Sequence, residues 1–365
     1  MFFNKFVRTL KPYKVSSHSA WEYGDDSKVL KLDWNEATIE PTPLVSKYIS
    51  EFLSTGRLNW YPNVDNTTLR LAISDYVGQS VDCVEYFASS DALHEYIIRT
   101  FIYPGDKVAM IGPTYDNFRA AAQSIGADIV YFKLTKKGRF IFDLDNFSNF
   151  MNKEMPKIVY LCNPNNPTGN VYSSETIEGL LRKYNDVLFV IDEAYYEFAD
   201  VSVSHLVDQF ENIVICRTFS KAFALASFRV GYAISSTHNI EGLRKVRNPK
   251  NISSCSQLAA LAALHDLPYT RRYVQEVNET KLWLVSKFKD MGLDVLGFDG
   301  GNFVFVDFGS KNKAIIEKLE EHKIYIRSYA HVDDMQTYSR ISIGNLEQMK
   351  YFLDALIGVL DEICY

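Results

Sequence analysis

Three residues in the middle of the chain have the types and the spacing of a reactive centre. Lys221 lies in the segment Thr218–Lys221, shortly after the apolar run Ile213–Cys216, and Arg229 follows eight residues later. Asp192 comes directly after another apolar run, 187–191. An amine, a carboxylate and a guanidinium at strand ends are groups that hold pyridoxal phosphate (PLP). The lysine forms a Schiff base with its aldehyde, the acid pairs with its pyridine nitrogen and the arginine binds its phosphate.

Further polar residues extend this set. Tyr195 and Asn166 would hydrogen-bond the ring oxygen of the cofactor, Asn166 from the turn Asn163–Gly169. The hydroxyl groups of Thr218 and Ser220 would also bind the phosphate. So would the free N–H groups at the start of a helix, which belong to Ser90, Asp91 and Ala92. Burial near cations lowers the pKa of a lysine, so we expect Lys221 to act as a nucleophile and base near pH 7.

Each of these residues, taken alone, has an ordinary interpretation. Lys221 could be a surface lysine, and Asp192 could cap a helix. Ser89–Asp91 could equally be a plain helix cap, and segment 163–169 could be a structural turn. The ordered set favours the cofactor over these separate explanations.

Composition and charge exclude several classes of protein. The 365 residues are 47% hydrophobic with a net charge of −6, which is typical of a globular enzyme and not of a nucleic-acid-binding protein. Five scattered cysteines without a CxxC indicate a reduced compartment. No apolar run reaches the roughly 18 residues of a membrane span, and the charged start is unlike a signal peptide. We expect a cytoplasmic protein without membrane or nucleic-acid partners. The seven histidines lack metal-ligand spacing, so we expect no metal site.

The hydrophobic pattern predicts an α/β protein. Short apolar runs alternate with helical stretches, which indicates a large domain with a mostly parallel sheet covered on both faces by helices. In such sheets ligands bind at the carboxyl ends of the strands. After about residue 255, long helices followed by short strands predict a smaller α+β domain. We expect an N-terminal arm over 1–25, a large PLP-binding domain over 41–254 and a small domain over 26–40 plus 255–365. The strand-length runs are Lys107–Ile111, Ile129–Phe132, Lys157–Cys162, Val187–Ile191, Ile213–Cys216 and Val230–Ile234.

A set of motifs resembles fold-type I PLP-dependent aminotransferases, and more narrowly their histidinol-phosphate aminotransferase branch. The resemblance implies an aspartate aminotransferase-like fold and covers nearly the whole chain. The matching segments are Leu10–Tyr13, Leu32–Glu36, Tyr61–Pro62, Pro113–Tyr115, Asn163–Gly169, Ser220–Ala226 with Arg229 and Gly231, Gly301–Phe303, Arg327 and Arg340.

The resemblance implies further site residues. Tyr115 would stack on the pyridine ring, and Tyr61 would reach the site of a neighbouring subunit, which requires a homodimer. Arg340 would bind the carboxylate of an amino donor such as glutamate. Arg327 and Arg340 together would meet the phosphate of a phosphorylated substrate. Tyr13, in the N-terminal arm, and Asn166 are further candidates for substrate binding.

Three segments depart from the branch's usual pattern: Asn35–Thr38, Ser89–Ala92 and Pro249–Asn251. The last puts Lys250 where an aromatic residue is usual. An added cation favours a small, polar phosphorylated substrate such as serinol phosphate, whose keto form is dihydroxyacetone phosphate, although histidinol phosphate stays a candidate.

Two other functions use the same features. A PLP-dependent phosphoamino-acid decarboxylase resembles the same branch and differs in the bond that breaks. A PLP-binding transcription regulator would need an N-terminal DNA-binding domain, for which we expect no room because the aminotransferase-like pattern begins near residue 10.

Overall fold

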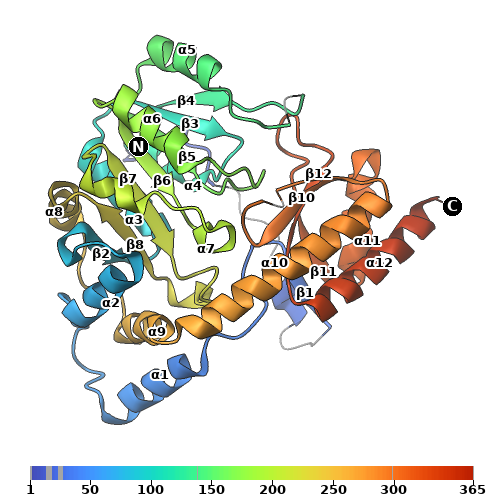
Figure 1. Ribbon diagram of the computed structural model, residues 1–365, viewed down its shortest axis with the longest axis horizontal. Helices are drawn as coiled ribbons and strands as arrows, with labels where there is room; N and C mark the ends of the chain where they lie inside the picture. The colour runs from blue at the N-terminus through green and yellow to red at the C-terminus, as the bar shows by residue number, and fades with distance from the viewer. Residues whose placement is uncertain (1, 14–18, 24–27, 138, 298, 365) are drawn as a thin grey trace.

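The computed structural model describes residues 2–13, 19–23, 28–137, 139–297 and 299–364. Within these ranges the strands form two sheets, one of seven strands and one of five (Figure 1). The larger sheet has the order β2-β8-β7-β6-β5-β3-β4. Its strands are β2 Val84–Phe87, β3 Lys107–Gly112, β4 Asp128–Lys133, β5 Ile158–Cys162, β6 Leu188–Asp192, β7 Ile213–Thr218 and β8 Gly231–Ser235.

The larger sheet confirms the predicted mostly parallel architecture. Strands β4, β3, β5, β6 and β7 pair in parallel, and β8 is antiparallel to both β7 and β2. All six predicted apolar runs coincide with strands, to within two residues. Because the carboxyl ends of parallel strands share one edge, the ends of β6 and β7 bring Asp192 and Thr218 to the same edge.

Strand alternation assigns side chains to two faces of this sheet. On one face, Tyr160 of β5 and Val190 of β6 pack with helices α3 Ser90–Phe101, α4 Asn117–Ser124 and α8 Thr237–Val246. Asp192 lies two residues beyond Val190 and so belongs to the same face as α3. The opposite face packs against α2 Thr67–Val77, α5 Leu144–Glu154, α6 Ser174–Lys183 and α9 Ser254–Leu264.

The smaller sheet has the order β1-β11-β12-β10-β9. It joins a strand from near the start of the chain, β1, to four strands from its last quarter, and β11 is antiparallel to β12. The short strands β1 and β9 were not predicted, nor was β2 of the larger sheet. The strands are β1 Leu30–Leu32, β9 Asp294–Leu296, β10 Phe303–Asp307, β11 Ile324–Ser328 and β12 Tyr338–Ser342, and helices α10 Leu267–Asp290, α11 Asn312–Glu321 and α12 Leu346–Cys364 pack beside them.

The division into domains stays a proposal, and the packing favours one change to it. Helix α9 packs against α1 Pro43–Thr55 and α2, and its alanines belong to the core of the larger sheet. Figure 1 shows α10 running from beside α9 to the smaller sheet. We therefore place the second boundary after Leu264 rather than at residue 255.

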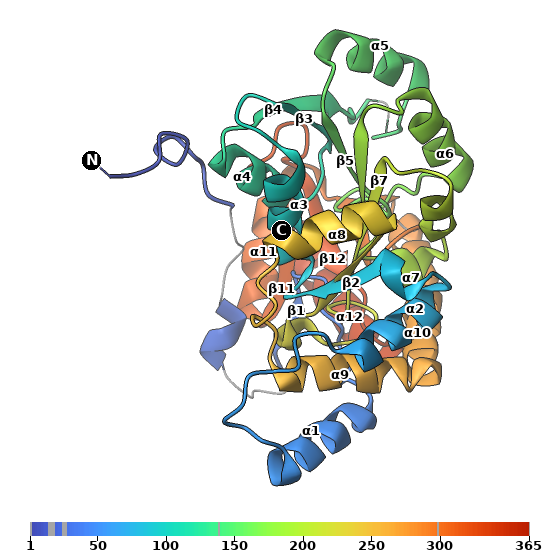
Figure 2. The same cartoon turned by 90° about the vertical axis from the view of Figure 1, so that its left-hand side faces the viewer.

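Figure 2 shows the first residues of the chain extending outward beyond α4. Among the described residues, every helix is too short or too polar to span a lipid bilayer.

Candidate active site

Lys221 lies three residues after the end of β7. Its Nζ donates a hydrogen bond of 2.9 Å to the carbonyl oxygen of Trp34, next to β1. Burial, and secondarily the positive charge of Arg340, lower the pKa of Lys221 to about 8. This agrees with the lowered pKa expected from the sequence, and it leaves about a tenth of the amine neutral at pH 7.

Asp192 is the last residue of β6 and is only 3% exposed. Its Oδ1 accepts a hydrogen bond of 3.1 Å from the N–H of Ala194 in the turn that follows the strand. The next helix begins only at Tyr196, so Asp192 does not cap it. Its Oδ2 accepts a hydrogen bond of 2.6 Å from the hydroxyl of Tyr160, and Nε2 of His94 lies 3.4 Å from the same oxygen. A buried carboxylate held by these partners is suited to pair with a cation.

Tyr195 and Asn166 meet at the phenol oxygen. The side-chain amides of Asn166 and Asn35 donate to Tyr195 Oη over 3.3 and 3.0 Å, and Arg340 Nη1 donates to Asn166 Oδ1 over 2.6 Å. Because two N–H groups occupy the acceptor sites of the phenol, its own proton is left to donate. Burial raises the pKa of Tyr195 and keeps that proton in place.

Thr218, Ser220 and Arg229 form a second cluster at the same edge of the sheet. Thr218 Oγ1 donates to Ser220 Oγ over 3.0 Å, and Arg229 Nη1 donates to the same oxygen over 3.4 Å. The first turn of α3 lies close by: a methyl group on Gly231 would stand 2.5 Å from the backbone nitrogen of Ser90. Hydroxyls, a guanidinium and a helix N-terminus thus gather where we expected a phosphate.

Asp91, in that first turn, contributes its carboxylate as well as its backbone. It accepts hydrogen bonds from the Tyr115 hydroxyl, over 2.8 Å, and from Arg229 Nη2, over 3.0 Å. Both partners were predicted to contact the cofactor. Asp91 therefore orients the expected stacking ring and the expected phosphate-binding arginine at once.

Arg327 and Arg340 are directly opposite each other in the antiparallel pair β11–β12. Opposed like charges on one face of a sheet repel each other. Both act on the Tyr13 phenol, whose pKa burial raises and the two arginines lower to a smaller extent. The Tyr13 ring packs edge-on against Tyr115, with centroids 5.7 Å apart. Nε of Arg340 is buried and has no hydrogen-bond partner among the described residues. This arrangement can accept an anion.

Tyr61 and Lys250 lie together, away from the residues above. Tyr61 is 77% exposed, and Lys250 Nζ stands 4.6 Å above the centre of its ring. Within this single chain, no contact that the structure describes joins Lys250 to Lys221 or Arg340.

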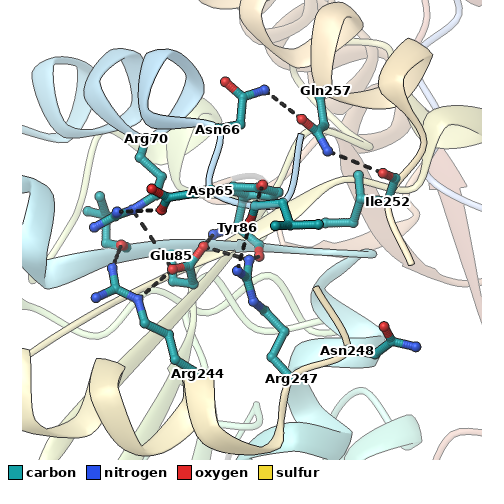
Figure 3. A network of polar contacts seen from close by, with 12 residues as sticks. Asp65, Asn66, Arg70, Glu85, Tyr86, Arg244, Arg247, Asn248, Ile252 and Gln257 are labelled. Atoms are coloured by element: carbon teal, nitrogen blue, oxygen red, sulfur yellow. Dashed lines mark hydrogen bonds and ion pairs between the residues drawn. The ribbon is translucent and has the colours of Figure 1, made fainter. Parts of the chain in front are cut away.

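A buried cluster around Glu85 fixes the segment that follows Tyr61 (Figure 3). Glu85 is 1% exposed and accepts from Arg244 Nε over 2.6 Å and from Arg247 Nη1 over 2.7 Å. Arg247 Nη2 and the Tyr86 hydroxyl both donate to the carbonyl oxygen of Val64, over 3.3 and 3.2 Å. Hydrogen bonds therefore hold the chain in place close to the exposed Tyr61.

Three contacts near the site were not predicted: His94 and Tyr160 beside Asp192, and Asn35 on Tyr195. Asn35 stands in a segment that matched a known motif, which was a signal for it. His94 lies next to Leu93, in a helical stretch whose apolar residues Leu93, Ile97 and Phe101 recur at a spacing of four, which indicated burial but no partner.

Comparison with known proteins identifies the family. A family model described as aminotransferase class I and II matches residues 27–356. The chain belongs to this family. It is a PLP-dependent aminotransferase with the fold-type I architecture that its motifs predicted.

Individual relatives agree with this. The chain is 43% identical over 357 residues to a dihydroxyacetone phosphate transaminase of Campylobacter jejuni, covering 97% of this chain and 96% of that protein. It is 33% identical over 338 residues to a histidinol-phosphate aminotransferase of Ruminiclostridium cellulolyticum, covering 92% and 93%. Its structure is similar to that of a histidinol-phosphate aminotransferase of Sinorhizobium meliloti in complex with PLP, with a TM-score of 0.89, 26% identity and coverage of 99% and 98%.

The residues present fit the cofactor. The amine of Lys221, the buried carboxylate of Asp192 and the Ser220 cluster supply the donors and acceptors that its aldehyde, ring nitrogen and phosphate require. Within the described ranges, no three His, Cys, Asp or Glu side chains gather in a way that could hold a metal ion.

Proposed function

We propose that this aminotransferase exchanges an amino group between glutamate and a small phosphorylated ketone. In the favoured case glutamate and dihydroxyacetone phosphate give 2-oxoglutarate and serinol phosphate. Arg327 and Arg340 carry this proposal, because two arginines at paired positions of neighbouring strands suit a dianion or two separate anions. The similarity to a dihydroxyacetone phosphate transaminase supports it.

Bound PLP supplies an electron sink for the bond-breaking step. The amine of Lys221, when it is not bonded to the cofactor, would serve as the base that takes a proton from the substrate carbon and returns it. Its lowered pKa suits this work, because a base acts best when its pKa is near the working pH. Asp192 keeps the ring nitrogen protonated, and the phenol of Tyr195 donates to the ring oxygen beside Asn166. Tyr115 would cover the ring face, while Thr218, Ser220, Arg229 and the N–H groups of Ser90 and Asp91 would hold the phosphate. The N–H of Ala92, a further candidate, donates instead to Ser89 Oγ over 3.2 Å.

On the substrate side, Arg340 binds the carboxylate of glutamate with help from Asn166, and Arg327 binds the substrate phosphate. Tyr13, whose phenol is within electrostatic reach of both arginines and whose ring packs against Tyr115, would contact the substrate from the N-terminal arm. We assign Lys250 to the substrate as well, through the subunit arrangement described next.

We further propose a homodimer in the cytoplasm. Tyr61 is a large, exposed aromatic residue on a segment that the Glu85 cluster holds in place, which suits a contact with a second copy (Figure 3). Because Lys250 lies over Tyr61, the two side chains would enter the neighbouring site together, and the ammonium of Lys250 would add a cation near the substrate phosphate.

Half-reactions test the substrate assignment. Purified enzyme loaded with PLP is titrated separately with serinol phosphate, histidinol phosphate, serinol and glutamate, and the absorbance of the bound cofactor is followed. We expect rapid conversion to pyridoxamine phosphate with glutamate and serinol phosphate, and much slower conversion with serinol. Equal rates with serinol and serinol phosphate would refute the phosphate assignment. Release of CO₂ from a phosphorylated amino acid, without a keto product, would identify a decarboxylase instead.

Arg327→Ala separates the two halves of the reaction. Loss of one partner from a desolvated charge pair costs roughly 2–5 kcal/mol, so kcat/KM for serinol phosphate should fall at least ~30-fold, at about tenfold per 1.4 kcal/mol. The glutamate half-reaction should lose far less. Equal losses in both would show that Arg327 does not distinguish the phosphate.

A further inference from the structure

His94 is a fully buried residue that the reaction scheme above does not use. Its exposed fraction is 0%, and neither ring nitrogen makes a hydrogen bond within the described part of the chain. Buried polar atoms are nearly always satisfied, so two in one side chain call for a physical explanation.

Aromatic rings surround His94 on several sides, and the charged group that it approaches is the carboxylate of Asp192. Its ring packs edge-on against Phe118 and Tyr160, at centroid distances of 5.3 and 5.5 Å, and lies tilted to Tyr115 at 6.4 Å. Nε2 points to Oδ2 of Asp192, 3.4 Å away. A small rotation of the ring or of the carboxylate would turn this approach into a hydrogen bond.

Tyr160, in β5, binds the same carboxylate oxygen. Its hydroxyl donates to Asp192 Oδ2 over 2.6 Å, and burial raises the pKa of Tyr160, so it stays a donor. The buried hydroxyl of Tyr160, from a strand, and the buried Nε2 of His94, from a helix, therefore both approach Oδ2 of Asp192. The N–H of Ala194 holds the other oxygen, which fixes the plane of the carboxylate.

Helix α3 links this contact to the other end of the site. Its first turn holds Asp91, which orients Arg229 and Tyr115, and His94 follows one turn later. Residues three or four apart lie on one face of a helix. The same helix face therefore reaches both the Ser220 cluster and Asp192.

We propose that His94 is a positioning residue for Asp192. With its proton on Nε2, it donates to Oδ2 and, with Tyr160, holds the carboxylate of Asp192 in place for the pyridine nitrogen of PLP. The proposal rests on the assignment of Asp192 to that nitrogen. Hydrogen bonds to charged groups are stronger than those between neutral ones. Removal of the His94 donor should therefore weaken the binding of the protonated PLP ring by Asp192.

The test replaces His94 and measures the bound cofactor without any substrate. In His94→Leu the dissociation constant of PLP should rise tenfold or more. The pH at which the absorbance band of the lysine-bound cofactor titrates should also move upward, because a ring nitrogen that holds its proton less firmly repels a second proton at the imine less. A merely structural change would not shift this titration.

Two matched variants place the effect on one atom. A glutamine amide can reach the position of Nε2, whereas an asparagine amide reaches only that of Nδ1. His94→Gln should therefore keep PLP affinity and titration close to those of the parent enzyme, and His94→Asn should behave like His94→Leu. This comparison also decides the matter if His94→Leu does not fold.

Tyr160→Phe and Asp192→Asn separate the possible failures. Tyr160→Phe should show a weaker version of the His94→Leu effect, and the double variant should exceed either one. If Asp192→Asn leaves PLP binding and titration unchanged, the assignment of Asp192 itself is wrong. If Asp192→Asn shows the effect but His94→Leu binds PLP within twofold of the parent with an unchanged titration, or if the Gln and Asn variants behave alike, the role of His94 is overturned.

Discussion

At the scale of single residues, the buried amine of Lys221 ties stability to pH in the cofactor-free protein. Its pKa is lowered to about 8 in the folded chain from an ordinary value of 10.5. Below pH 8 both folded and unfolded chains carry the proton, and the folded chain bears the whole cost of the buried charge. As pH rises from 8 toward 10.5 the folded lysine is neutral first, so this cost fades.

Lys221→Met should therefore stabilise the cofactor-free protein at pH 7 by up to about 3 kcal/mol, at about 1.36 kcal/mol per unit of pKa shift. The gain should shrink strongly by pH 10. Urea unfolding of both proteins at the two pH values measures it. A gain that is the same at both pH values would mean that packing, and not charge, is responsible. The variant should also lose turnover by at least ~10²–10⁴-fold, the usual contribution of a positioned base.

At the scale of elements, the position of α3 depends on Gly231 at the start of β8. A methyl group there would lie 2.5 Å from Ser90 N and 2.8 Å from the carbonyl oxygen of Arg217. Both neighbours are backbone atoms and cannot rotate away. Overpacking of this kind typically costs about 1–3 kcal/mol, and it displaces the helix start at the expected phosphate position.

Gly231→Ala should therefore lower both the melting temperature and the affinity for PLP. Gly179→Ala is the matched control, because Gly179 lies inside α6 and a methyl group there meets nothing within 4 Å. That control should be neutral or stabilise the protein by about 0.5–1 kcal/mol. Undiminished PLP affinity in Gly231→Ala, measured by fluorescence titration, would contradict the proposed role of the α3 N-terminus.

The sequence predicted six of the seven strands of the larger sheet, because each is a short apolar run bounded by Gly, Pro, Asn or a charged residue, as Val187–Ile191 is ended by Asp192. That pattern also predicted which side chains lie at strand ends. It could not predict the contact of His94 with Asp192, which depends on how α3 packs on the sheet. The opposition of Arg327 and Arg340 depends on strand register, and strand β1 is too short to give a pattern.

At the scale of the whole molecule, the proposed dimer makes each site depend on two chains. Lys221→Ala and Tyr61→Ala homodimers should both be nearly inactive. In a mixed dimer, one of the two sites combines an intact Lys221 with an intact Tyr61 from the other chain. Refolding the two variants together should therefore restore part of the activity.

Differently tagged chains allow the mixed dimer to be purified, and its expected activity is at most half that of the parent enzyme. Tyr103→Ala is a control for Tyr61→Ala, because Tyr103 is comparably exposed but lies after α3, at the other end from the proposed site. A verified mixed dimer without activity would argue against shared sites, and an enzyme that is monomeric and active would rule them out.

The pairing of Arg327 on β11 with Arg340 on β12 has a consequence for the choice of buffer. Two opposed positive charges are relieved by any small dianion that fits between them, so inorganic phosphate and sulfate should occupy the place of the substrate phosphate. Such ions would compete with the phosphorylated substrate while protecting the protein against heat. Kinetics recorded in phosphate buffer would understate the affinity of the enzyme for its phosphorylated substrate. Storage in the same buffer would slow the loss of folded, active enzyme.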